Sequence, residues 1–435
     1  MKALTASVLL LFVFLSSIAF SEGAKGPAED FFDYGIKLMD EGRYAEAAEE
    51  FDKAIDLKAD YLEAYLQRGI CHVYTEELPA ALNDLSLVIS KDLANYRAYF
   101  WRARAYRGSG DVKQALLDCS RCIQAAPTWV PGYELKGDIL LEQGDVQAAY
   151  ESYKKAVEVA PGEADLMMKK GRTEIMIARF DDAIATMDDI LKILPKFYEA
   201  CYLRADARMG KKDFAGAEAD INLGISFDPW KESPTIFFRR GLVRLLSSRF
   251  DGAAGDFKSA TASSRPEKAR YIVYLCLTLK LGGRTFEANE RASMAKDMLQ
   301  GVISDDEFKT RWSLIFSYIR GDSDESTLID AAIANLEDRE FAGLSYFCVA
   351  MVNLAAGKEN RSIECFYRVT ELSSPKFPEC SVATTWRSML EAREILCPPK
   401  PKAEAEPPAP EKPPEAKPEA TPAVTPTPPA AKPEQ

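Results

Sequence analysis

The stretch VPGYELKGDILLEQGDVQAAYESYKKAVEVAPGE, residues 130–163, decides the fold. Apolar side chains recur at helical spacing in each of its halves, and Gly144–Asp145 separates the halves as a turn. Pro161 ends the second half because proline cannot donate the next helical hydrogen bond. The stretch therefore predicts two antiparallel helices, over residues 130–143 and 146–159, joined by a tight turn.

The same pattern returns every 34 residues, so the fold is built from repeats. The eighth position of each unit is small, and its residues are Gly35, Gly69, Ala103, Gly137, Gly171, Ala205 and, after a two-residue insertion, Gly241. The twentieth position is alanine in each of these units, and its residues are Ala47, Ala81, Ala115, Ala149, Ala183, Ala217 and Ala253. We expect Gly137 and Ala149 to face each other and let the two helices approach closely. Since one hairpin cannot bury its own apolar face, the units must stack on one another.

These marks resemble the tetratricopeptide repeat (TPR), a 34-residue helix–turn–helix unit. The resemblance implies an all-α TPR solenoid, a right-handed superhelix of helix–turn–helix repeats. We expect seven clear repeats within residues 22–267. Residues 268–397 keep the period with weaker marks, so we expect degenerate TPR-like helical repeats there, closed by a capping helix.

The first residues of the sequence differ from the repeats. Residues 1–21 begin with Met1 and Lys2, followed by an uncharged apolar run, which is the pattern of a secretory signal peptide. We expect cleavage before Glu22, and no membrane span after it. The alternative is an uncleaved anchor, because the run is just long enough to cross a bilayer.

Residues 398–435 also differ from the repeats. They consist mainly of Pro, Ala, Glu, Lys and Thr and contain almost no large hydrophobic side chain. Such a segment cannot bury a core, so it is predicted to be disordered with a bias towards polyproline II. It could serve as a solubilising tail, as a spacer, or as a ligand for a groove on a partner.

Composition argues against several classes of function. The net charge is −12 and Lys and Arg are scattered, so the basic stripe of a nucleic-acid-binding protein is missing. His72 is the one histidine, and no catalytic constellation or phosphate-binding loop is visible, so we expect neither an enzyme, a metal nor a cofactor. Cys119 and Cys122 have the spacing of a redox pair but occupy mid-helix core positions, so we expect buried small hydrophobes.

The TPR resemblance also implies where a partner binds. In that family the first helix of each repeat lines a concave groove. Carried onto this sequence, the candidate groove residues are Phe32, Leu66, Arg97, Phe100, Arg104, Arg107, Glu134, Asp138 and Tyr202.

The third repeat is the most informative part of this set. Arg97, Arg104 and Arg107 share one helix face with Phe100. Three guanidinium groups beside an aromatic ring, in an acidic protein, suit a peptide carboxylate or an acidic side chain. The alternative is that the arginines pair with two carboxylates of the next repeat, Glu134 and Asp138.

These features predict an exported, non-enzymatic scaffold or adaptor of a bacterial cell envelope, with a protein or peptide as its partner. The combination of a signal sequence and TPR hairpins is similar to periplasmic TPR adaptors of the NlpI type. Two alternatives stay open: a lumenal co-chaperone of a eukaryotic secretory pathway, and a self-assembling structural array. TPR proteins that bind acidic chaperone tails use a Lys/Asn/Arg clamp, and Phe32 and Ile36 stand where that clamp needs Lys and Asn.

Overall fold

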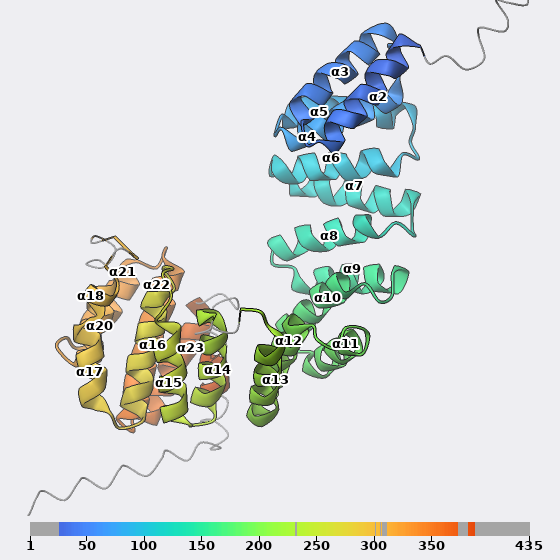
Figure 1. The fold of residues 1–435 in the computed structure, drawn as a ribbon. Coiled ribbons are helices and arrows are strands. Elements are labelled where there is room, and N and C mark those ends of the chain that lie inside the picture. The colour runs from blue at the N-terminus through green and yellow to red at the C-terminus, as the bar shows by residue number, and fades with distance from the viewer. Residues whose placement is uncertain are drawn as a thin grey trace, which may run out of the picture.

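The computed structural model describes residues 26–230, 233–300, 302–304, 306, 311–372 and 382–387, and these residues form helices joined by short turns (Figure 1). The helices are α2 (Pro27–Asp40), α3 (Tyr44–Leu57), α4 (Leu62–Tyr74), α5 (Leu78–Lys91), α6 (Tyr96–Gly108), α7 (Val112–Ala125), α8 (Val130–Glu142), α9 (Val146–Val159), α10 (Ala164–Met176), α11 (Phe180–Ile193), α12 (Tyr198–Gly210), α13 (Phe214–Phe227), α14 (Pro234–Leu246), α15 (Phe250–Ala260), α16 (Lys268–Leu281), α17 (Thr285–Ser293), α18 (Ala295–Met298), α20 (Ser313–Arg320), α21 (Glu325–Ala334), α22 (Arg339–Ala355) and α23 (Glu359–Leu372).

The predicted helical hairpins are confirmed. α8 and α9 begin and end within a residue of the predicted bounds, and Gly144 between them adopts the left-handed conformation, with φ of 80°. In four other repeats the equivalent turn residue has a positive φ without being glycine, at Glu76, Ala178, Lys212 and Ser248. A side chain in this conformation is strained by about 1–2 kcal/mol, so packing of the hairpin holds these turns closed.

The small eighth position of the repeat makes room for an aromatic ring. A Cβ atom added at Gly137 would lie 2.6 Å from the ring of Tyr153, and the nearest atoms all belong to that ring. Glycine is therefore required at this position by the ring of Tyr153, and not by the expected contact with Ala149. The same relation joins Gly35 to the ring of Phe51, which would lie 2.7 Å from an added Cβ atom.

A ladder of ion pairs joins the first helix to the second within four of the repeats, and Arg68 and Arg204 also pair with a carboxylate of the preceding repeat, Asp52 and Asp188. Arg102 donates to both carboxylate oxygens of Asp118 on the next helix, at 2.7 and 2.9 Å, and to Ser86 of the preceding repeat at 3.0 Å. The same sixteen-residue spacing joins Arg68 to Asp84, Arg204 to Asp220 and Arg240 to Asp256. Bidentate pairs of this kind fix the orientation of both helices.

The first repeats stack one after another, and the C-terminal helices pack differently. In Figure 1, α2 to α13 follow one another as successive pairs. Their buried side chains form several small clusters, one of which includes Ile236 and Val243 of α14, whereas the other clustered side chains of α14 to α23 merge into one large cluster. There α16 contacts α22 directly, so the helices depart from strict succession. Residues 382–387 add a helical turn that buries Trp386 in this cluster.

Three predictions lie wholly or partly outside the described residues. The signal peptide over residues 1–21 and the tail over 398–435 belong to this group. Of the predicted capping helix, residues 382–387 are described, and they are helical.

Candidate functional site

The first helices of successive repeats form one continuous layer. α4 contacts both α2 and α6, α6 contacts α8, and α10 contacts α12, in addition to each helix's own hairpin partner. All nine candidate groove residues belong to this layer: Phe32 to α2, Leu66 to α4, Arg97, Phe100, Arg104 and Arg107 to α6, Glu134 and Asp138 to α8, and Tyr202 to α12. The layer therefore carries the candidate site.

Two of the candidate residues support this layer from within the core. Leu66 and Tyr202 are buried, at 1% and 9% exposure. The hydroxyl of Tyr202 donates to Asp228 at 3.0 Å, and burial raises the pKa of this phenol. Neither side chain is available to a partner, so the predicted site needs correction at these two positions. Phe32 is partly buried, with its ring 5.0 Å from that of Tyr61.

Two of the three candidate arginines on α6 are paired within the layer. Arg97 donates to Glu63 of α4 at 3.2 Å. Arg107 donates through Nε to Glu142 of α8 at 3.0 Å. The sequence suggested Glu134 or Asp138 as their partners. Arg97 instead pairs with Glu63 of the preceding repeat, and Arg107 pairs with Glu142 of the following repeat. Both arginine side chains are long enough to reach these neighbouring helices.

Glu134 and Asp138 are neutralised by a lysine that the sequence did not single out. Lys169 of α10 donates to Glu134 at 2.7 Å and to Asp138 at 2.8 Å. Burial lowers the pKa of Lys169, but these two bonds outweigh it and raise the pKa overall. Asp138 also accepts a bond from the hydroxyl of Tyr153 at 2.7 Å. These carboxylates are therefore satisfied by the fold.

Arg104 is different from its two neighbours. Among the described residues its side chain has no ion pair and no hydrogen bond. Its guanidinium carbon lies 4.5 Å from the centroid of the Trp101 ring and 5.5 Å from that of Tyr74. Tyr74 in turn stacks on Tyr44, with ring centroids 4.1 Å apart and planes 8° from parallel. Arg104 is thus held against two rings while its N–H donors have no acceptor in the described part of the chain.

The rings around Arg104 were missed because they occupy other positions of the repeat. Tyr44, Tyr74 and Trp101 come from α3, α4 and α6. The positions that the family resemblance assigns to the groove do not include these three. The density of aromatic residues from Tyr96 to Trp101, YRAYFW, is a signal that could have pointed to Trp101, but it does not reach Tyr44 or Tyr74.

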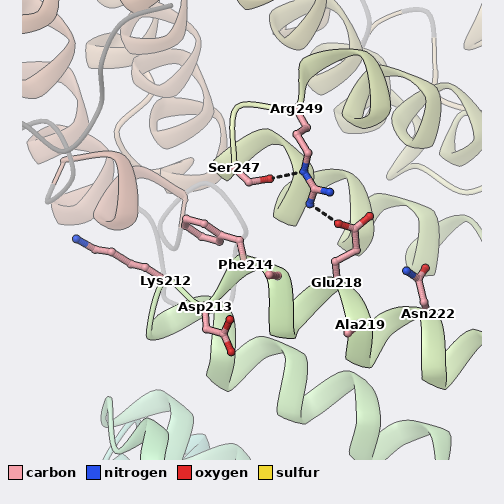
Figure 2. Close-up of a pocket in the computed structure, with 9 residues that line it drawn as sticks. Lys212, Asp213, Phe214, Glu218, Ala219, Asn222, Ser247 and Arg249 are labelled. Carbon is pink, nitrogen blue, oxygen red and sulfur yellow. Dashed lines mark hydrogen bonds and ion pairs between the residues drawn. The ribbon is translucent and has the colours of Figure 1, made fainter.

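Figure 2 shows a pocket where α13 meets the turn between α14 and α15. Its volume is about 620 Å³ and its lining includes Phe214, Glu218 and Arg249. Burial would raise the pKa of Glu218, but bonds from Arg244 and Arg249 outweigh it and lower the pKa. Arg249 also donates to Ser247 at 3.0 Å. Arg249 thus bonds both Glu218 and Ser247 within the lining, as expected at a junction between repeats.

The cysteine pair is confirmed as part of the core. Cys119 and Cys122 are buried, and burial raises the pKa of each thiol to about 12. Within the described ranges no group of three His, Cys, Asp or Glu side chains is arranged to hold a metal ion. No helix in those ranges combines the length and apolar character needed to cross a membrane.

Comparison with known proteins agrees with the repeat architecture. Two family models described as tetratricopeptide repeat match residues 96–128 and 140–197. The human DnaJ homolog subfamily C member 3 is 27% identical over 175 residues, which are 37% of this chain and 35% of that protein. Hsp70-Hsp90 organizing protein 2 of Arabidopsis thaliana is 29% identical over 92 residues, which are 21% of this chain and 16% of that protein. The matched region thus spans about a third or less of these relatives.

Among solved structures, the C-terminal part of a TPR repeat-containing protein from Cytophaga hutchinsonii is 16% identical, with a TM-score of 0.48. The alignment covers 53% of this chain and 94% of that structure. The two family-model matches and the helical hairpins of the structure show that the chain contains tetratricopeptide repeats and folds as an all-α solenoid. Proteins built from these repeats bind protein partners and are generally non-catalytic scaffolds, and this fold supports a role in protein–protein interaction.

Proposed function

We propose that this chain is an exported adaptor of the bacterial cell envelope that binds a peptide or protein partner on the layer of first helices, at α2, α4, α6 and α8. A carboxylate of the partner pairs with Arg104. The observation that carries the proposal is the contrast on α6: Arg97 and Arg107 have carboxylate partners, and Arg104 has two aromatic rings instead.

The physical reason is the cost of ordering a long side chain. An arginine that is free in solution loses rotamer entropy when it binds, about 1.5–2 kcal/mol. The rings of Trp101 and Tyr74 already restrict the Arg104 guanidinium. Its planar fork can then donate two parallel bonds to a carboxylate with less further loss of entropy.

Placement in the cell envelope is supported by the sequence of residues 1–21, which has the pattern of a secretory signal peptide. Fractionation of the source cells tests it. The protein is expected in the periplasmic or membrane fraction, and recovery in the cytosolic fraction alone would contradict the placement.

A second candidate function is that of a co-chaperone. Similarity to a DnaJ homolog and to an Hsp70-Hsp90 organizing protein favours it. Against an inherited chaperone clamp stands the first repeat, where Phe32 packs against the rings of Phe51 and Tyr61. Retention of a chaperone of the Hsp70 or Hsp90 class on the purified full chain would favour this candidate.

The experiment that tests the adaptor function is photocrosslinking in intact cells from a photoreactive amino acid at Phe100. A discrete exported partner should be captured, and the variant Arg104→Glu should lose it. Lys113→Glu is the matched control, because it reverses an exposed charge on α7, the second helix of the same repeat. Capture that is unchanged by Arg104→Glu, or crosslinks confined to the chain's own helices, would overturn the proposal.

A further inference from the structure

A row of six aromatic rings crosses the first three repeats beside Arg104. Successive ring centroids are 4.1, 5.4, 5.5, 4.8 and 4.9 Å apart. The rings, in order, are those of Tyr44, Tyr74, Trp101, Phe100, Trp129 and Tyr96. None of the six side chains is buried, and Tyr74 is 44% exposed. The other five rings are partly buried and also pack against the core clusters, so each offers only part of its surface to a ligand.

Such a surface has a preferred type of ligand. Rows of aromatic rings bind proline-rich segments, because the polyproline II helix is already extended and loses little entropy on binding. The rings pack against proline, and a flanking charge fixes the direction of the peptide. Here that charge is Arg104, whose guanidinium lies over Trp101 and Tyr74 at the Tyr44 end of the row.

The chain's own tail contains a segment of matching chemistry. Every third residue from 404 to 419 reads Glu404, Pro407, Pro410, Pro413, Ala416 and Glu419. With three residues per turn these six residues would share one face of a polyproline II helix, about 9 Å apart along its axis. The face carries three prolines in its middle and a carboxylate at each end. That arrangement complements a row of rings with a single arginine at one end.

We propose that residues 404–419 bind the aromatic row of the same molecule. Pro407, Pro410 and Pro413 pack on the rings, and a terminal carboxylate of the segment, Glu404 or Glu419 according to direction, pairs with Arg104. The inference rests on the proposed function, since both use the same helix layer, and it makes the tail a competitor of the partner. Tethering favours the intramolecular complex, because a flexible linker raises the effective concentration to about the millimolar range.

The test uses the full chain with p-benzoylphenylalanine in place of Tyr74. Irradiation of dilute protein should join this position to residues 404–419 within one molecule, as mapped by mass spectrometry. The yield should be roughly tenfold lower in the triple variant Pro407→Ala/Pro410→Ala/Pro413→Ala, and also in Arg104→Glu. The matched control, Pro422→Ala/Pro426→Ala/Pro429→Ala, removes three prolines outside the segment and should keep the yield.

Three results would overturn the inference: crosslinks only to the chain's own helices, an equal loss of yield in both triple variants, or adducts between two molecules that increase with protein concentration. Circular dichroism of each variant separates loss of binding from loss of folding. Failure here is distinguishable from failure of the proposed function, because an exported partner captured from Phe100 would remain even if the tail never reaches the row.

Discussion

The ladder of ion pairs between helices gives the sharpest prediction about stability. Asp118 is completely buried, and Arg102 supplies two of its three hydrogen bonds, at 2.7 and 2.9 Å. The third bond comes from the more exposed Arg121 at a longer distance, 3.4 Å. The variant Arg102→Met would leave a buried carboxylate with this one weak partner. Breaking a buried pair in this way destabilises a protein by about 3–5 kcal/mol.

Equilibrium unfolding in urea measures the effect. Repeat proteins are stabilised by contacts between neighbours, so we expect a lower midpoint for the third repeat and its neighbours. The control is Lys155→Met, which removes a pair with Glu158 in which both side chains are about half exposed. Exposed pairs contribute about 0.2–1 kcal/mol, so this control should change the free energy of unfolding little.

A double variant separates the ion pair from simple loss of packing. Replacing both partners by apolar residues, in Arg102→Met/Asp118→Leu, removes the unpaired charge and should restore most of the lost stability. The reasoning would be refuted if Arg102→Met had no larger effect than Lys155→Met. It would also be refuted if the double variant were less stable than the single one.

Four further predictions concern the repeats themselves. Gly137→Ala should lower the free energy of unfolding by about 1–3 kcal/mol, because the new Cβ would lie 2.6 Å from a tyrosine ring, whereas Gly255→Ala, with no atom within 4 Å, should not. Ala178→Gly should raise the thermal midpoint by relieving a φ of 59°, worth about 1 kcal/mol, and an unchanged or lower midpoint would speak against strain there. Burial raises the pKa of Cys119 and Cys122 to about 12, so neither thiol should react with a maleimide at pH 8 until denaturant is added. The pKa of each thiol in the folded protein is higher than its value of about 8.5 in the unfolded chain. The stability that the neutral thiols contribute is therefore complete below about pH 8.5 and is lost as the pH rises towards 12. Denaturation curves between pH 8 and 11 would detect this loss.

The fold could be predicted from the sequence because each repeat carries the same pattern of small and apolar residues. A small residue at the eighth position and alanine at the twentieth recur in register in all seven repeats, although glycine marks the turn only at Gly42, Gly110 and Gly144. The sequence did not reveal why the eighth position is small. That reason depends on the size of a side chain in the partner helix: glycine occurs opposite Tyr153, whereas Ala103 occurs in the repeat that has Cys119 at the corresponding position.

The candidate site was less predictable, because ion-pair partners depend on the reach of long side chains. Arg97 and Arg107 are on the predicted helix face, but each extends along the helix axis to a different neighbouring repeat. Position in the repeat also did not separate Leu66, which is buried, from Arg104, which is not. The choice of ion-pair partner and the burial of each side chain both depend on how one repeat is rotated relative to the next. The sequence pattern of a single repeat does not specify that rotation.

The central claim is that Arg104 receives a carboxylate of the partner. The most direct measurement is calorimetric titration of the partner captured from Phe100 into the wild-type chain and into Arg104→Gln. Hydrogen bonds to charged groups contribute about 1.5–3 kcal/mol, so the variant should bind at least roughly tenfold more weakly. Equal affinity of the two proteins, with both correctly folded, would contradict the account.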